Sequence, residues 1–395
     1  MTRSSLFMQT VLLAMVVGVP SPAAAQATIT DGLSFLLTNR SIPTGDFAGD
    51  EEATRATRDT IATLLKAELG TLPINASASG FTYRMDPALG GVPVRTTATF
   101  GAFVTERSLT IGERHLSFAA TYQAASFDRI DGRNLRDGTL QATASRLGTD
   151  PAPFDVETVT MRIHADTMTL SANYGITDRL DVGGALPLER LTLSGERVDT
   201  YRGTPVVQAT VAASASGPGD LLLRTKFHLL QRGTSGIAIG ADARLPTGNA
   251  ANLLGADRTT IKPRVIWSVD RNRVAVDSNV AYGLGGVSDE LDYGAAVTAA
   301  GTNTVTIVGE VAGRRLMSAG RLIDVTTRNP RLAGVETTRL SALDSGSNRA
   351  VATGGVKWNV NATWLVTANV SRSLGTDGLA ARWMSTVGAE YAFGE

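Results

Sequence analysis

The sequence predicts an all-β protein, a transmembrane antiparallel β-barrel of about fourteen strands (twelve as the alternative) with a short N-terminal helical segment. Three observations predict this fold class. Apolar and polar residues alternate with a period of two over most of residues 75–395, short connections alternate with long ones, and aromatic residues gather beside the short connections. In such a barrel the apolar face meets lipid, short turns face the periplasm, and aromatic residues form an interfacial girdle.

The composition excludes several classes of protein. The 395 residues include 37 Lys and Arg and 37 Asp and Glu, so the formal net charge is zero. A nucleic-acid partner is therefore not expected, because phosphate binding requires a basic excess. The absence of Cys excludes disulfides, thiolate catalysis and Cys-based zinc sites. The three His, at 115, 164 and 228, are too widely spaced for an HExxH metal site. We expect no enzyme activity, no cofactor and no metal.

Residues 1–25 predict a cleaved signal peptide. Arg3 supplies a basic start, Val11–Val17 an apolar centre and Ala23–Ala25 a peptidase site. Beyond residue 25 no apolar run approaches the roughly 20 residues that a spanning helix needs. Together with the strand pattern, this predicts export to the outer membrane of a Gram-negative-type bacterium, with outer-membrane lipid as a partner.

Residues 26–74 form a separate N-terminal segment with one amphipathic helix, expected from Asp50 to Leu69. Acidic residues at 50–52 suit the positive N-terminal end of a helix, and Gly70 is a good stop. Its apolar stripe is narrow, so the helix should dock on something larger. The stripe consists of Ile61, Leu64, Leu65 and Leu69. Three positions are open: a plug in the lumen, the periplasmic mouth, or a contact with a partner. Since the segment precedes the first strand, the first two are directly accessible.

The strands follow from residue 75 onward. Alternation is clearest in Leu221–Leu230, where Leu223 and Phe227 share one face and Arg224 and Lys226 the other. The predicted strands begin near residues 75, 96, 115, 156, 179, 217, 235, 258, 273, 289, 304, 347, 363 and 380. Alternation is weakest in the first two, which is why twelve strands are the alternative.

The connections and aromatic residues favour a membrane barrel over a soluble sandwich, which would show the same alternation. Short turns are predicted near 111–114, 176–178, 232–236, 270–272, 301–303 and 360–362, and long stretches near 131–155, 199–216, 247–257 and 317–346. The aromatic residues beside the short turns are Tyr174, Trp267, Trp358, Trp364 and Tyr391.

Near Asp166 the alternation changes phase. Val159 and Ile163 fall on one parity, whereas Met168 and Leu170 fall on the other. Either a β-bulge at this point or a strand that continues beyond the bilayer explains the change.

Charged residues on the polar faces are the candidate lumen-lining residues. Eight are basic and five acidic: Arg179, Asp181, Arg224, Lys226, Asp242, Arg244, Lys262, Arg264, Asp277, Glu310, Arg314, Lys357 and Glu390. One interpretation is a field across a pore that favours anions or polarises a constriction. The other is cross-strand ion pairing that stiffens the wall and hydrates the interior.

Three stretches resemble recurring segments of a known family. They are Ile176–Gly183, Gly219–Lys226 and Arg244–Gly248. They resemble segments of uncharacterised, transporter-like outer-membrane proteins in the grouping named after the meta pathway of phenol degradation, over most of residues 95–393. The resemblance implies a barrel that takes up small aromatic or otherwise hydrophobic compounds. More distantly, an N-terminal segment before fourteen strands is similar to long-chain fatty acid transporters, although the Asn-Pro-Ala motif of that family is absent here.

We therefore expect residues 75–395 to form an outer-membrane channel or transporter for the passive uptake of small solutes, with hydrophobic or aromatic compounds among the candidates. The helical segment would restrict its lumen. Two alternatives remain open: a non-conducting barrel with a structural or surface-interaction role, and a soluble periplasmic β-protein.

Overall fold

The computed structural model describes residues 28–38, 45–71, 80, 82–86, 92–361 and 363–394, so the predicted signal peptide lies outside the described residues. The helices are α2 (Ile29–Leu37), α3 (Phe47–Thr71) and the short 3-10 helix η2 (Ala250–Asn252). The strands before residue 219 are β1 (Tyr83–Asp86), β2 (Val92–Arg95), β3 (His115–Ile130), β4 (Arg133–Asn134), β5 (Leu140–Leu147), β6 (Asp155–Thr177), β7 (Leu180–Tyr201) and β8 (Thr204–Pro218). The later strands are β9 (Leu221–Arg232), β10 (Ser235–Leu245), β11 (Thr260–Arg271), β12 (Val274–Gly285), β13 (Glu290–Ala300), β14 (Val305–Leu316), β15 (Arg321–Arg328), β16 (Val335–Leu343), β17 (Ser347–Asn359), β18 (Trp364–Ser373) and β19 (Leu379–Gly394).

Twelve strands close an antiparallel ring, which confirms the predicted barrel and its alternative strand count. The order around the ring is β3, β6, β7, β9, β10, β11, β12, β13, β14, β17, β18 and β19, and β19 pairs with β3. The two weak strands predicted near residues 75 and 96 do not belong to this ring. Among the described residues, β1 and β2 pair only with each other, and residues 96–113 form no strand. That segment folds inside the barrel instead.

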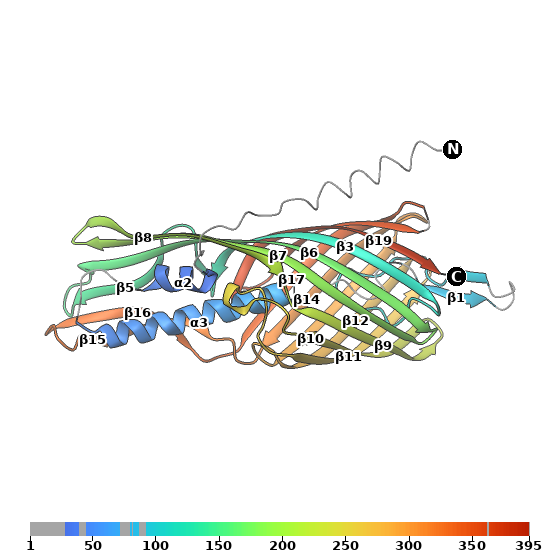
Figure 1. Ribbon diagram of the computed structural model, residues 1–395, viewed down its shortest axis with the longest axis horizontal. Helices are drawn as coiled ribbons and strands as arrows, with labels where there is room; N and C mark the ends of the chain where they lie inside the picture. Colours follow the sequence, from blue (N-terminus) through green and yellow to red (C-terminus); the bar gives the residue numbers. More distant parts are fainter. Residues whose placement is uncertain are drawn as a thin grey trace.

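The two ends of the barrel differ, as the alternating connections predicted. At one end, here called the short-turn end, the pairs β6–β7, β9–β10, β11–β12, β13–β14 and β17–β18 are joined by connections of a few residues. Gly233 (φ 59°) and Asn272 (φ 53°) occupy left-handed positions in two of these turns, which Gly and Asn tolerate best. The opposite end, here called the long-connection end, carries β4, β5, β8, β15, β16 and η2 (Figure 1).

The outer surface of the ring is apolar. Outward-facing residues such as Leu223, Phe227 and Val265 are exposed, whereas the residues that alternate with them are largely covered. Trp267 and Trp358 are exposed near the short-turn end, and the rings of Trp364 and Tyr391 lie 5.0 Å apart there. This arrangement matches the lipid-facing wall and aromatic girdle of a transmembrane barrel. Among the described residues, no helix is both long enough and apolar enough to cross a bilayer.

The change of phase near Asp166 marks a strand that leaves the bilayer. β6 keeps its register with β3 and β7 through this region, so no bulge is present at this point. Met168 and Leu170 are exposed on the outer face, whereas Val159 and Ile163 are buried on the inner face. Inner positions of the outer half of β6 are apolar because they pack beneath the N-terminal helices rather than line a water-filled lumen.

Helices α2 and α3 close the long-connection end with a hydrophobic core (Figure 1). The predicted amphipathic helix is confirmed as α3, and its aliphatic stripe is buried: Ile61, Leu64, Leu65 and Leu69. α2 contributes Ile29, Leu33, Leu36 and Leu37 to the same core. Polar contacts also fix α3, because Arg339 of β16 pairs with Asp46 at 3.0 Å and Asp50 at 2.6 Å, and Thr57 Oγ1 donates to the Leu340 carbonyl at 2.9 Å.

Candidate functional site

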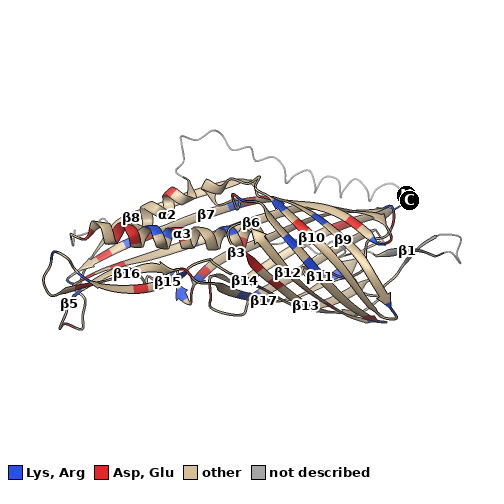
Figure 2. Ribbon diagram, turned by 90° about the horizontal axis from the view of Figure 1, so that it is seen from below, with Lys and Arg blue, Asp and Glu red and all other residues tan. Residues whose placement is uncertain are grey.

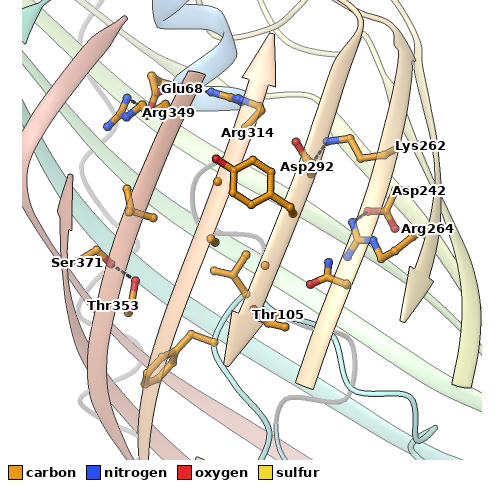
Figure 3. A pocket seen from close by; sticks show the side chains of 18 of the residues that line it. Glu68, Thr105, Asp242, Lys262, Arg264, Asp292, Arg314, Arg349, Thr353 and Ser371 are labelled. Atoms are coloured by element: carbon orange, nitrogen blue, oxygen red, sulfur yellow. Dashed lines mark hydrogen bonds and ion pairs between the residues drawn. The ribbon is translucent and has the colours of Figure 1, made fainter. Parts of the chain in front are cut away.

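The barrel interior holds a chamber of about 190 Å³. Its boundary toward the long-connection end includes Glu68, in the last turn of α3, and its boundary toward the short-turn end includes residues 103–105 (Figure 3). Strand side chains form the wall between these two limits. The chamber is therefore the space left between two segments that fill the barrel from opposite ends.

The chamber wall is basic on one side and neutral on the other. Six basic residues line it, Arg224, Arg244, Lys262, Arg264, Arg314 and Arg349, against the acidic residues Glu68, Asp242 and Asp292. They come from β9–β11, β13, β14 and β17, apart from Glu68 of α3. The facing wall carries Gln123, Thr353, Asn369, Ser371 and Thr386, with Val351 and Met384 beside them. Charged residues accordingly lie along the barrel strands as well as on α3 (Figure 2).

Two groups of ion pairs organise the basic side. Asp242 lies 3.3 Å from Arg224 and 2.7 Å from Arg264, and both arginines also pair with Glu106, at 2.9 and 3.8 Å. Lys262 lies 2.5 Å from both Glu290 and Asp292. These contacts are of the kind expected from the cross-strand ion pairing that the sequence suggested as one of two interpretations. Buried charges need such partners.

A third group joins the wall to α3. Arg314 Nη2 donates to Glu68 Oε1 at 2.9 Å, and its Nη1 donates to the Ala67 carbonyl at 2.7 Å. Arg349 pairs with the other oxygen of Glu68. Arg244 lies beside the end of the helix, because a Cβ built on Gly70 would lie 2.5 Å from its Nη1. Three arginines from three different strands therefore surround the C-terminal end of α3, which favours cations.

Residues 96–113 fill the half of the barrel toward the short-turn end and are called the inner plug here. Glu310 of β14 accepts hydrogen bonds from the backbone N–H groups of Phe103, Val104 and Thr105 and from Thr105 Oγ1. One wall carboxylate thus satisfies three successive backbone donors of a segment that has no sheet partner.

Other wall charges hold the inner plug in the same way. Lys357 Nζ donates to the Ala102 carbonyl at 2.7 Å, and Lys226 Nζ donates to the Arg107 carbonyl at 3.2 Å. Asp181 accepts from the Ile111 N–H at 3.0 Å, and Asp277 pairs with the buried Arg107 at 3.8 Å. These residues bind backbone and side-chain groups of the inner plug.

Twelve of the thirteen side chains predicted to line the lumen lie on the covered inner face of the barrel strands. Those in the chamber wall are Arg224, Asp242, Arg244, Lys262, Arg264 and Arg314. Those around or below the inner plug are Asp181, Lys226, Asp277, Glu310, Lys357 and Glu390. Arg179 is a correction: it lies in the two-residue turn between β6 and β7, where it is exposed. The strand predicted to begin near residue 179 starts one residue later, because β7 begins at Leu180.

Sequence reasoning missed several charged residues of the interior, among them Arg349, Asp292, Glu68 and Glu106. Arg349 and Asp292 sit at inward strand positions and follow the same period-two pattern that identified the others. Glu68 and Glu106 come from segments outside the ring, so no strand pattern could identify them.

One polar row lies on the outer face, away from the chamber. Ser126 Oγ is 2.7 Å from His164 Nδ1, and His164 Nε2 is 3.3 Å from Asp166 Oδ1. The backbone of this stretch is paired between β3 and β6. Within the described part of the chain, no group of three or more His, Asp or Glu residues is arranged to hold a metal ion.

The chain is similar to several known proteins. The family model described as "Putative MetA-pathway of phenol degradation" matches residues 144–380. An outer membrane channel from Pseudomonas putida F1 has a similar solved structure, with 14% identity over 72% of this chain and 98% of that one and a TM-score of 0.45. The NanC porin gives 7% identity, coverage of 68% and 98%, and a TM-score of 0.35. A FadL homologue from Pseudomonas aeruginosa has 10% identity over 81% of this chain and 97% of that one, with a TM-score of 0.33. No curated protein matches the chain.

Proposed function

The chain belongs to the family described as the putative MetA-pathway of phenol degradation, and from this premise we propose that it is a gated outer-membrane channel. It would admit small solutes passively, without a cofactor or covalent chemistry. The observation that carries the proposal is the chamber: a barrel with a lipid-facing exterior holds in its lumen a space of about 190 Å³ that is lined by six basic and three acidic residues. A barrel that served only as a scaffold would have no need of such a space.

Gating follows from the two closures. The apolar core of α2 and α3 fills the lumen on one side of the chamber, and the inner plug fills it on the other. A solute of the chamber's size passes only when both segments yield. We further propose that the short-turn end faces the periplasm, as short turns do in outer-membrane barrels.

Engineered disulfides test the proposal, because the chain contains no Cys of its own. A Cβ built on Gly236 lies 2.4 Å from Ser108 Oγ, so Ser108→Cys with Gly236→Cys would tie the inner plug to β10. A Cβ built on Gly32 lies 3.4 Å from Ala213 Cβ, so Gly32→Cys with Ala213→Cys would tie α2 to β8. Single-channel currents are recorded from each pair before and after reduction, with each single-Cys variant as the control.

We expect the reduced pairs to conduct like the unmodified protein and each oxidised pair to be silent. Undiminished current from an oxidised pair would mean that solutes pass without displacing that segment, which would refute gating there. Silence of every form, although all are folded as judged by heat-modifiable gel mobility, would favour the alternative of a non-conducting structural barrel.

A further inference from the structure

The contact between α3 and the chamber wall has the form of an anion site that is already occupied. The carboxylate of Glu68 lies between Arg314 and Arg349, one oxygen toward each (Figure 3). Paired guanidinium groups that converge on one carboxylate are the arrangement by which proteins bind free carboxylates and phosphates. Here the bound carboxylate belongs to the protein itself and arrives on a separate element.

The arginines beside this carboxylate carry more hydrogen-bond donors than Glu68 satisfies. Arg314 and Arg349 contact it, and Arg244 lies beside Gly70 at the same end of the helix. The nearby acid Glu290 is 3.7 Å from Arg314 and is shared with Lys262. Among the described residues, Arg244 forms no hydrogen bond or ion pair with any acid. Arg314 Nε and Arg349 Nε and Nη2 also lack hydrogen-bond partners there. Several buried donors therefore remain for the oxygens of a second anion, and unsatisfied donors of this kind are costly.

The chamber beside the three arginines gives the size and polarity of the ligand. Its volume of about 190 Å³ exceeds the ~150 Å³ of an engineered cavity that admits benzene. Leu222, Val351, Met384 and Phe103 supply apolar surface next to the charged groups. A ring-sized organic body with one carboxylate fits both features.

We propose that Arg244, Arg314 and Arg349 bind the carboxylate of a small organic acid in the chamber, and that Glu68 is an internal competitor for this site. The idea rests on the proposed function, since it names the solute class of that channel. When the last turn of α3 withdraws, its carboxylate leaves and the arginines accept the carboxylate of the solute. When the solute leaves, Glu68 returns and the end of α3 closes the chamber again.

The test measures binding of benzoate to the folded, detergent-solubilised protein by calorimetry, with neutral benzamide as the matched ligand. In Glu68→Gln the competing charge is absent, so benzoate should bind about tenfold more tightly than to the unmodified protein, a typical size for coupling between sites. Glu51→Gln is the matched control, because Glu51 is an exposed acid of the same helix and pairs with Arg55. Benzamide affinity should not change in either variant.

A second variant keeps the test decisive if Glu68→Gln does not fold. Arg244→Gln leaves both contacts of Glu68 intact and should abolish benzoate binding while heat-modifiable mobility is retained. Equal benzoate affinity in Glu68→Gln, Glu51→Gln and the unmodified protein would overturn the proposal. So would benzoate binding that survives Arg244→Gln, or benzamide binding as tight as that of benzoate.

Channel recordings separate this proposal from the proposed function. If benzoate binding depends on Glu68 and Arg244 but no form of the folded protein conducts, the anion site stands and the channel function fails. If the protein conducts and benzoate binding is indifferent to both residues, the channel stands and the anion site fails.

Discussion

Replacing Glu310 by Ala is expected to release the inner plug. In the closed barrel this carboxylate accepts hydrogen bonds from three successive backbone N–H groups and one hydroxyl, at residues 103–105. Hydrogen bonds to charged groups contribute roughly 1.5–3 kcal/mol each. Because the four bonds share two oxygens, we count them as about two independent bonds. At the lower limit of the range for each bond, their contribution is roughly 3 kcal/mol. The closed state loses this stabilisation, whereas water satisfies the same N–H groups once the plug is released.

A loss of about 3 kcal/mol corresponds to roughly a hundredfold rise in the ratio of open to closed channels. Single-channel recording in planar bilayers measures this ratio as the open probability. Glu310→Gln retains one carbonyl acceptor and should give an intermediate rise. Glu336→Ala removes an acid of β16 that pairs with Arg146 at 2.9 Å and touches no plug residue, so it should have no effect. An open probability in Glu310→Ala within about threefold of the unmodified protein would refute the reasoning.

Three further predictions concern the lipid-facing wall, the hydrophobic core of α2 and α3, and the dependence on pH. Val265→Arg places a charge on the lipid face, where Val265 is 57% exposed, and should cost about 2–4 kcal/mol in urea unfolding from vesicles, whereas Val265→Leu should be neutral. Leu36→Ala removes a fully buried side chain of α2 and should cost about 2–5 kcal/mol of local stability. The loss would be measured as faster tryptic cleavage in α3. Phe35→Ala changes a position that is 40% exposed and should not speed this cleavage. In the outer extension of β6, beyond the bilayer, burial and the nearby Asp199 raise the pKa of Asp155 to about 7. The folded extension therefore binds a proton more tightly than the unfolded chain. Amide protection there should rise as pH falls from 8 to 5.5, and Asp155→Asn should remove this dependence.

The ring could be predicted because the bilayer imposes a strict period of two. Lipid outside and a polar interior leave each strand position with one acceptable polarity, so twelve of the predicted strand starts coincide with β3, β6, β7, β9–β14 and β17–β19. The segment at 96 was misassigned for a physical reason. A plug inside a polar lumen must present both apolar groups, such as Phe100 and Phe103, and polar groups, such as Thr99 and Thr105. That mixture resembles a strand, and only the wall contacts distinguish the two.

The interior charges could be placed on a face but not paired. A period of two puts Glu310, Arg314 and Lys226 inside, yet their partners are the inner plug, Glu68 and Glu106, more than a hundred residues away in sequence. The sequence therefore supported two interpretations of these charges, a field across a pore and ion pairing. In the structure, the interior charges differ by position. Charges at the inner plug bind protein groups, whereas those around the chamber include the arginines with unused hydrogen-bond donors.

The two closures differ in chemistry, and this difference orders their opening. The closure at the long-connection end buries aliphatic side chains of α2 and α3. Exposing each of these side chains to water would cost roughly 1.5–3 kcal/mol of stability. The inner plug is held mostly by hydrogen bonds that water can replace at a net cost of about 1 kcal/mol each, or somewhat more for charged groups. Complete withdrawal of the helices is thus far more costly than release of the plug.

The end of α3 is the exception, because Glu68 and the Ala67 carbonyl are held by arginines rather than by apolar packing. Fraying of this last turn would vacate the arginine site while the rest of the outer core stays closed. A solute carboxylate that replaces Glu68 compensates for the ion pairs lost, so the chamber can exchange its own anion for a foreign one without unfolding the segment that covers it.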